Sequence, residues 1–216
     1  MAGGILKKGL LPTGHVRDTF QIEGVGKIEA SVVDAGNLGV FVRAAELGVS
    51  LEVPLTSLQQ IDLLRRLEDV RGQFAEQLGL IGDRKAMDTA LLCNPFFILL
   101  GSPCSYPNYL TGRTVEKESA DIVCRLVANA VWHKAYPVTG TIATGAAARI
   151  QGSLAYEAMP ASAHREPKVR IGHPGGVIDI KVAASKRNET WTLQEAWVGR
   201  TARILSDGWA FLPAQE

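Results

Sequence analysis

The chain has 216 residues, enough for one large domain or two small ones with a sizeable buried core. Its 23 basic and 22 acidic side chains leave a formal net charge of +1, which argues against a nucleic-acid surface. Three cysteines without CxxC or Cys/His spacing indicate neither a disulfide framework nor a zinc site, and no apolar run approaches the ~20 residues of a membrane span, so we expect a soluble, cytoplasmic protein.

The first third of the chain predicts two strands and a long helix. Strands are expected at 27–33 and 40–43, joined by a turn at 34–39 where Gly and Asn tolerate positive φ. A helix is expected from Thr56 or Ser57, either of which can serve as its N-cap, to about residue 79. One apolar stripe of this helix is predicted to face a core or an interface; it consists of Leu63, Leu64, Leu67, Val70, Phe74 and Leu78.

The middle of the chain predicts a strand and a second amphipathic helix. Residues 90–100 form an apolar, β-rich run that Pro95 interrupts, which indicates a bend, a bulge or an edge position. The second helix is expected at about 116–134, with Asp121 and Arg125 forming a pair spaced i,i+4.

A different kind of helix is expected at about 140–150, where small and apolar residues with almost no charge predict burial on most sides. From about residue 152 the chain alternates in the manner of strands, with segments at 177–182, 190–193 and 209–212 between turn signals. These elements predict an α+β protein with more strands than helices.

The start of the apolar helix is the first candidate binding site. Thr139, Gly140 and Thr141 lie in its first turn, where unpaired backbone N–H groups and a partial positive charge suit a carboxylate, and the two Thr hydroxyls add donors. The alternative is an ordinary Thr N-cap without a ligand.

The second candidate is the turn at 171–176. Its three glycines flank His173 and Pro174, so the backbone can bend sharply and approach a ligand closely, with Gly175 and Gly176 before the next strand. His173 has a suitable pKa for an acid or base. The alternatives are a tight turn between strands and a structural histidine.

The third candidate is a strand near the carboxyl terminus. Arg200 and Thr201 begin a run that ends at Arg203, and arginine side chains suit bidentate binding of carboxylates. A solvated strand face is the alternative. No GxSxG, HExxH, Walker or GxGxxG motif is present, and no pair of bases for proton transfer is visible.

Five ordered segments resemble the PrpF family from its middle to its end: LLPTGHVRDTF, GVGKIEASVVDAGNLGVFVRAAELG, HKAYPVTGTIATGAAARI, IGHPGGVIDIKV and GRTARILSDGWAFLP. The resemblance implies a diaminopimelate epimerase-like fold, in which each of two lobes wraps a β-barrel-like sheet around a central apolar helix that points at the substrate. It implies that residues 1–20 are a remnant of the interlobe connection and that 21–186 form the carboxyl-terminal lobe. It also implies that 187–216 are terminal strands belonging to an amino-terminal lobe that is largely missing here.

The same resemblance implies an isomerase of propionate metabolism that needs neither a metal nor an organic cofactor. Family members move or isomerise a double bond in a small unsaturated tricarboxylate, such as methylaconitate or aconitate, by proton transfer. The substrate-binding positions, with His173 added from its turn, are Asn37, Thr139, Gly140, Thr141, His173, Gly175, Gly176, Arg200 and Thr201. The catalytic residues stay unassigned, because the family's base Lys and Gly-Asn-Cys-Gly turn would precede Leu10.

The sequence also departs from the family pattern. Leu38 stands where the family usually has Pro, His15 where it has Asn, and Gly175 where it has Ser, which removes a hydroxyl contact. The alternative to an isomerase is therefore a truncated, non-catalytic homologue that binds an acid or a partner protein. Terminal strands without their lobe would expose an apolar edge, which favours a homodimer, and we expect no nucleic-acid or membrane partner.

Overall fold

The computed structural model describes residues 4–83, 93–199, 203–209 and 211, and in this part of the chain most strands join one mixed sheet. The sheet has nine strands in the order β1-β2-β3-β4-β7-β9-β10-β11, with β8 paired to β7. These strands are β1 (Asp18–Ile22), β2 (Gly26–Ala35), β3 (Asn37–Arg43), β4 (Phe96–Gly101), β7 (Ile122–Ala128), β8 (Val131–Trp132), β9 (Lys168–His173), β10 (Gly176–Arg187) and β11 (Thr190–Val198). A separate two-stranded ribbon consists of β5 (Tyr106–Pro107) and β6 (Thr114–Val115).

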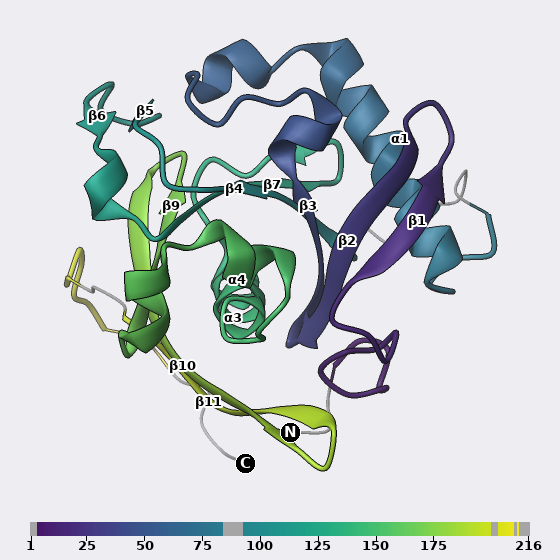
Figure 1. Cartoon of the computed structure of the whole chain (residues 1–216). Coiled ribbons are helices and arrows are strands. Elements are labelled where there is room, and N and C mark those ends of the chain that lie inside the picture. The colour runs from purple at the N-terminus through teal and green to yellow at the C-terminus, as the bar shows by residue number, and fades with distance from the viewer. Residues whose placement is uncertain (1–3, 84–92, 200–202, 210, 212–216) are drawn as a thin grey trace.

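The sheet curves around one helix, as Figure 1 shows. The α-helices described are α1 (Ile61–Gln77), α3 (Val138–Ala147) and α4 (Leu154–Ala158). Helix α3 contacts β2 and β3 as well as β10 and β11, whereas α1 lies on the outer side of the sheet. An inner apolar layer therefore surrounds α3 and α4, and an outer layer lies between the sheet and α1. The α+β class, with more strands than helices, is confirmed.

The hairpin of β2 and β3 brings the first candidate residue to one end of the sheet. Its turn is tighter than the expected 34–39, because Ala35 pairs with Asn37 and only Gly36, with a φ of 82°, lies between them. Asp34 belongs to the strand, and its carboxylate accepts hydrogen bonds from the backbone N–H groups of Ile5 and Leu6, at 2.8 Å each. The amino-terminal segment is thereby fixed against β2.

Helix α1 confirms the predicted stripe but not the predicted start. Residues Leu55–Leu58 form a 3₁₀ turn, and the N-cap of α1 is Gln60, so neither Thr56 nor Ser57 caps the helix. Leu67, Val70 and Phe74 are buried in the outer layer, and the other stripe residues pack against it. The stripe faces the core.

The prediction of a helix at about 116–134 is wrong. After the short 3₁₀ turn Lys117–Ser119 the chain forms β7, whose Ile122 and Leu126 belong to the inner layer and Val123 and Val127 to the outer one. A strand that is buried on both faces is apolar at nearly every position, so a helical spacing of apolar residues fits it by coincidence. The expected pair at 121 and 125 is absent, because the Asp121 carboxylate binds Arg170 and Arg125 is buried elsewhere.

Strand β4 is an interior strand, so the edge position suggested by Pro95 is wrong. The strand begins at Phe96, pairs in parallel with β3 and in antiparallel with β7, and is buried along most of its length. Pro95 lies just before the strand, where the lack of a backbone N–H does not interrupt the hydrogen bonds between strands. The residues expected at 90–92 lie outside the described part of the chain.

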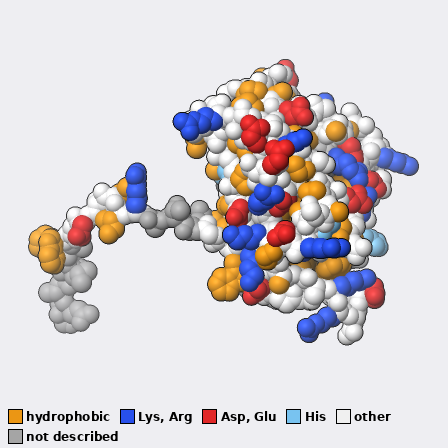
Figure 2. Space-filling model, turned by 60° about the vertical axis from the view of Figure 1, so that its left-hand side comes forward, with side chains coloured by type: hydrophobic (Ala, Val, Ile, Leu, Met, Phe, Trp, Pro, Cys, Tyr) orange, Lys and Arg blue, Asp and Glu red, His pale blue; other side chains and the backbone are white. Residues whose placement is uncertain are grey.

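The carboxyl-terminal third mixes helix and strand. Helix α4 and a 3₁₀ turn, Ala161–Arg165, precede β9, so the strand-like alternation begins later than residue 152. The strands expected at 177–182 and 190–193 are parts of β10 and β11. Trp209 and Phe211, in the strand expected at 209–212, have no regular structure and are 99% and 100% exposed. Figure 2 shows a segment that carries apolar side chains and projects from the body. Among the described helices none is long and apolar enough to cross a membrane.

Candidate functional site

The amino end of α3 presents backbone donors without intrahelical acceptors. Pro137 is the N-cap, and the first N–H bonded within the helix is that of Thr141, which donates to the Pro137 carbonyl oxygen at 2.8 Å. The N–H groups of Val138, Thr139 and Gly140 precede it, so helix geometry gives them no acceptor inside α3. The alternative of a Thr N-cap is wrong, because no side chain caps this helix.

Asn37 lies beside this helix end although it is 102 residues away in the chain. Its Nδ2 donates a hydrogen bond to the Thr139 Oγ1 at 3.2 Å. Accepting that bond leaves the Thr139 hydroxyl hydrogen available to a ligand. Asn37, Thr139 and the helix N–H groups together form a cluster of donors, which we call the α3 donor cluster. Such a cluster suits a carboxylate.

Gly140 allows α3 to approach the sheet closely at this point. A Cβ at this position would lie 3.0 Å from the Pro137 Cγ and 3.1 Å from the Leu126 Cδ1. Thr141, in contrast, is fully buried and its Oγ1 donates to the Pro137 carbonyl oxygen at 3.0 Å. Of the two Thr hydroxyls proposed as ligand donors, the geometry therefore favours that of Thr139.

The turn from His173 to Gly176 is held by the protein itself. The Gly175 N–H donates to the His173 Nδ1 at 3.1 Å, and the Asn108 Nδ2 donates to the Gly175 carbonyl oxygen at 2.9 Å. The Tyr106 hydroxyl donates to the Gly176 carbonyl oxygen at 2.7 Å. The Gly175 N–H is thus bonded within the turn and is not free for a ligand, so the geometry favours a supporting role for the turn.

His173 is buried, and its environment keeps the imidazole neutral. Burial, together with the nearby charges of Arg125 and His133, lowers the pKa of His173 to about 4. Its Nδ1 accepts the Gly175 N–H, which assigns the ring proton to Nε2. A neutral, internally bonded imidazole orients the turn and is a poor proton acceptor near neutral pH.

The turn contacts the segment that leads into α3. The rings of His173 and Tyr136 stack with centroids 6.1 Å apart, and a Cβ at Gly175 would lie 3.3 Å from the Lys134 carbonyl oxygen. The Tyr136 hydroxyl is in turn hydrogen-bonded to the Thr144 Oγ1 within α3, at 2.8 Å. Through Tyr136 the turn is therefore linked to the helix that carries the donor cluster.

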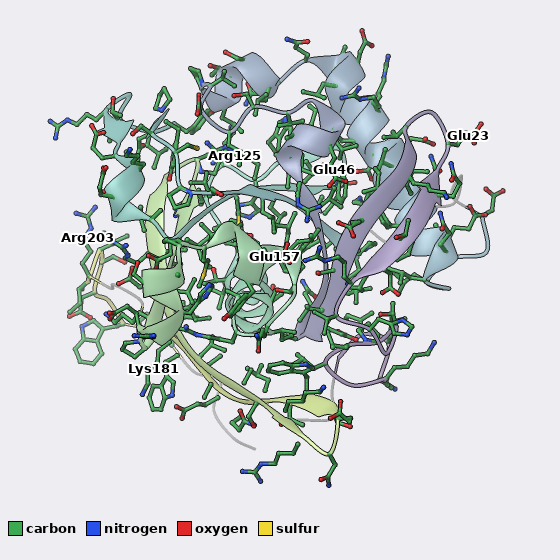
Figure 3. All side chains as sticks on the ribbon, in the orientation of Figure 1. Glu23, Glu46, Arg125, Glu157, Lys181 and Arg203 are labelled. Atoms are coloured by element: carbon green, nitrogen blue, oxygen red, sulfur yellow. The ribbon has the colours of Figure 1, made fainter. Side chains whose placement is uncertain are left out.

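Arg200 and Thr201 lie outside the described residues, so their predicted role stays a prediction. Arg203 is described, has no regular structure, and lies at the periphery of the fold in Figure 3. In the same figure Arg125 lies inside the fold. Sequence reasoning missed Arg125, Tyr106 and Asn108 as supporting residues; the polar, aromatic loop at 101–113 was the signal available for the last two.

Comparison with known proteins decides the family. Residues 2–213 match the family described as PrpF protein. The chain belongs to the PrpF family. It is 32% identical to the 3-methylitaconate isomerase of Eubacterium barkeri, over 94% of this chain and 52% of that protein. It is 30% identical to the 2-methyl-aconitate isomerase of Shewanella oneidensis, over 94% of this chain and 51% of that protein.

A solved structure agrees with these PrpF relatives. The crystal structure of methylitaconate-delta-isomerase superposes with a TM-score of 0.76 at 28% identity, covering 91% of this chain and 55% of that chain. The chain thus spans about half the length of the curated relatives it matches. The PrpF family and its isomerase relatives, expected from the sequence, are confirmed.

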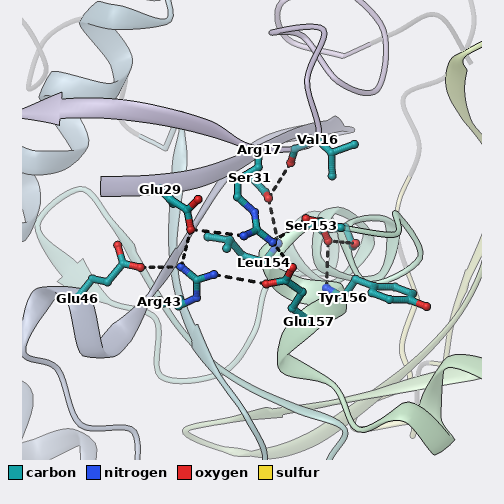
Figure 4. Close-up of polar contacts among 12 residues, drawn as sticks. Val16, Arg17, Glu29, Ser31, Arg43, Glu46, Ser153, Leu154, Tyr156 and Glu157 are labelled. Carbon is teal, nitrogen blue, oxygen red and sulfur yellow. Dashed lines mark hydrogen bonds and ion pairs between the residues drawn. The ribbon is translucent and has the colours of Figure 1, made fainter. Parts of the chain in front are cut away.

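A cavity lies at the other end of the sheet from Asn37. It measures about 530 Å³ at the carboxyl ends of β3 and β4, and its lining includes Arg43, Leu51, Leu100, Cys104, Leu154 and Glu157. Arg17 and Arg43 bind Glu29 and Glu157 beside it, and Arg43 also binds Glu46 (Figure 4). The network pairs two cations with three carboxylates and so leaves an excess of negative charge, which does not suit a polycarboxylate, and none of the positions implied by the PrpF resemblance lines the cavity.

Metal-binding side chains do not gather at either place. In residues 4–83, 93–199, 203–209 and 211, no three His, Cys, Asp or Glu side chains form a group that could hold a metal ion. The three cysteines are free, with Cys93 exposed and Cys124 buried.

Proposed function

We propose that this chain supplies the carboxylate-binding half of a PrpF-type isomerase, in which the α3 donor cluster holds a carboxylate of a small unsaturated tricarboxylate such as methylaconitate or aconitate. The reaction moves or isomerises the double bond by proton transfer without a cofactor. The observation that carries the proposal is the hydrogen bond of Asn37 to Thr139 at a helix end whose N–H groups lack helical acceptors. We further infer that the sheet around α3 is one lobe of a diaminopimelate epimerase-like protein.

The chemistry suits this arrangement. Removing a proton beside a carboxylate places additional negative charge on that carboxylate, and donors fixed before the reaction stabilise this charge without reorganising. The two relatives are named as isomerases of 3-methylitaconate and 2-methyl-aconitate, which are small unsaturated di- and tricarboxylates. His173 is neutral and bonded to its own turn, so the proposal assigns the proton transfer to groups outside this cluster.

The second candidate is a homologue that binds an acid or a partner protein and does no chemistry. It is favoured by the same observation on His173, because a neutral imidazole bonded within its own turn offers no base to an acid bound at α3. The isomerase and the acid-binding form of the second candidate both predict acid binding at α3, whereas a homologue that binds only a partner protein does not. The two acid-binding candidates differ in turnover.

The test therefore measures binding and turnover separately. Titration of ¹⁵N-labelled protein with cis-aconitate should shift the amide signals of Thr139 and Gly140, and the Asn37→Ala variant should weaken this binding. Ser102→Ala, which alters a residue of the distant cavity, is the matched control and should bind as the unaltered chain does. No shift at α3 with saturating cis-aconitate would contradict the isomerase and the acid-binding homologue, and would leave the homologue that binds a partner protein.

Turnover is followed by ultraviolet absorbance of the moving double bond in cis-aconitate or methylaconitate. The chain is assayed alone and after mixing with the half of the 3-methylitaconate isomerase that it does not match. Turnover in either assay that depends on Asn37 supports the isomerase. Binding without turnover in both assays supports the non-catalytic homologue.

A further inference from the structure

Arg125 is a buried cation that the described structure does not neutralise. It lies on β7, its side chain is 1% exposed, and it donates to the carbonyl oxygens of Leu51 at 2.8 Å and Cys124 at 3.0 Å. Its Nε is buried without a hydrogen-bond partner, and no carboxylate among the described residues forms an ion pair with it.

A second buried arginine shows that this arrangement is unusual for the chain. Arg71 is also 1% exposed, but its guanidinium forms an ion pair with the Glu68 carboxylate. A buried charge without an ionic partner is much costlier than a paired one, because its desolvation is not offset by an opposite charge. Arg125 therefore carries a free-energy cost that Arg71 avoids, and hydrogen bonds to carbonyl groups offset only part of it.

The contacts of Arg125 lead directly to the His173 turn. Its guanidinium carbon lies 4.5 Å from the centroid of the Tyr106 ring, in a cation–π contact, and the Tyr106 hydroxyl donates to the Gly176 carbonyl oxygen. A Cβ at Gly172 would lie 2.9 Å from that hydroxyl, so glycine at this position makes room for it. The guanidinium, the phenol ring and the turn thus form one packed series.

We propose that Arg125 is a positioning residue: it holds Tyr106 against the His173–Gly176 turn, which packs through Tyr136 against α3 and so helps to fix the α3 donor cluster for a bound polycarboxylate. The part concerning the ligand rests on the proposed function. The part concerning the turn does not, because it follows from contacts within the chain.

The charge of Arg125 has a measurable local consequence. The groups that face His173 are Arg125 from β7, His133 from the segment after β8, the Tyr136 ring, and Tyr106 through the shared turn. Burial is the largest cause of the low pKa of His173, and the Arg125 charge is the next. Removing that charge should therefore raise the pKa of His173, whereas retaining it in another cation should not.

The experiment compares charge removal, charge retention and loss of an unrelated buried arginine. Arg125→Met and Arg125→Gln remove the charge, Arg125→Lys keeps it, and Arg71→Met removes the paired arginine. For each protein the ring signals of His173 are titrated by NMR, and the dissociation constant of cis-aconitate is measured by calorimetry. Tyr106→Phe tests the bond to the turn while keeping the ring beneath the guanidinium.

We expect the pKa of His173 to rise in Arg125→Met and Arg125→Gln and to remain low in Arg125→Lys and Arg71→Met. Arg125 reaches the α3 site through Tyr106, the turn and Tyr136, so the neutral variants, which lose the contact with Tyr106, should bind cis-aconitate roughly severalfold more weakly. Tyr106→Phe should weaken binding while leaving the titration of His173 nearly unchanged.

The proposal is overturned if His173 titrates alike in the unaltered chain and in the neutral variants. It is also overturned if Arg71→Met weakens binding as much as Arg125→Met does, because a purely structural role would give that result. If the neutral variants do not fold, Arg125→Lys and Tyr106→Phe still decide, since equal cis-aconitate binding by Tyr106→Phe and the unaltered chain refutes the positioning role. If the unaltered chain does not bind cis-aconitate while the His173 shift occurs, the proposed function fails and the assignment to the turn stands.

Discussion

The buried histidine makes stability depend on pH in a predictable direction. The pKa of His173 falls from its ordinary 6.5 to about 4 in the folded chain, chiefly because burial disfavours the imidazolium. The unfolded chain therefore binds more protons than the folded one between these two values, so stability falls as the pH drops through this window. At 1.36 kcal/mol per pH unit, the full effect is roughly 3 kcal/mol, of which about 2 kcal/mol appears between about pH 7 and pH 5.

The perturbation that isolates this effect is His173→Asn. The Asn Oδ1 occupies nearly the position of the imidazole Nδ1 and can accept the Gly175 N–H, but it does not titrate. We expect the variant to lose about 1 kcal/mol at neutral pH, from the lost contact with Tyr136, and to become the more stable protein near pH 5.

The assay is urea unfolding of both proteins at several values between about pH 5 and pH 8, analysed by linear extrapolation. His164, whose pKa is also lowered by burial, is present in both proteins and cancels in the difference. Parallel pH dependences for the variant and the unaltered chain would refute the reasoning, because they would mean that His173 titrates alike in the folded and unfolded states.

Three further predictions follow from packing, from the donor cluster and from the exposed segment. Gly145→Ala should lower the melting temperature, since its Cβ would lie 2.8 Å from the Ile180 Cγ2 and the Val182 Cγ2. The cost of this overpacking, about 1–3 kcal/mol, exceeds the gain in helix propensity of ~1 kcal/mol. Thermal unfolding measures the effect, with Gly140→Ala, whose contacts are looser, as the comparison. Thr139→Val should weaken cis-aconitate binding roughly tenfold, as measured by calorimetry. The double variant with Asn37→Ala should lose less binding free energy than the sum of the two single variants, because one hydrogen bond joins the two side chains. Additive losses would contradict the α3 donor cluster. We also propose a homodimer through β11, whose outer edge pairs with no other described strand, and through the exposed side chains of Ile204, Leu205, Trp209 and Phe211. Sedimentation should therefore show a dimer that truncation after residue 198 converts to a monomer, and a stable monomer of the full chain would reject the proposal.

The inner helix and the strands beside it were predictable because their composition, their apolar spacing and their turn residues all indicate the same elements. The apolar composition of α3 required burial on all sides, and the sheet that curves around it supplies that environment. The stripe of α1 was predictable for the same reason, since a one-sided helix must cover an apolar surface. The start of α1 was not, because Thr56 and Ser57 lie in a 3₁₀ turn that the sequence does not distinguish from a first helical turn.

Strand β7 shows why the middle of the chain was misassigned. Its position between two apolar layers depends on α1 and α3, which lie far away in the sequence. The spacing of apolar residues distinguishes a strand from a helix only when one face of the element is polar. In a strand that is buried on both faces this distinction is lost. Arg125 added to the error, because Asp121 and a cation four positions later resemble an ion pair on the surface of a helix. In the structure Arg125 is instead the one polar residue on the buried outer face of the strand.

The candidate site was partly predictable, and the division has a physical basis. Helix geometry alone places free N–H groups at residues 138–140, so the sequence of a helix start is enough to find them. The contribution of Asn37 required the tight turn at Gly36 to project it toward α3, and the loss of the Gly175 N–H to His173 depended on side-chain conformation. A glycine-rich turn offers backbone donors only if its own side chains leave them free. His173 takes one, so the available donors lie at α3, and an acid bound by this chain should contact the helix start before the turn.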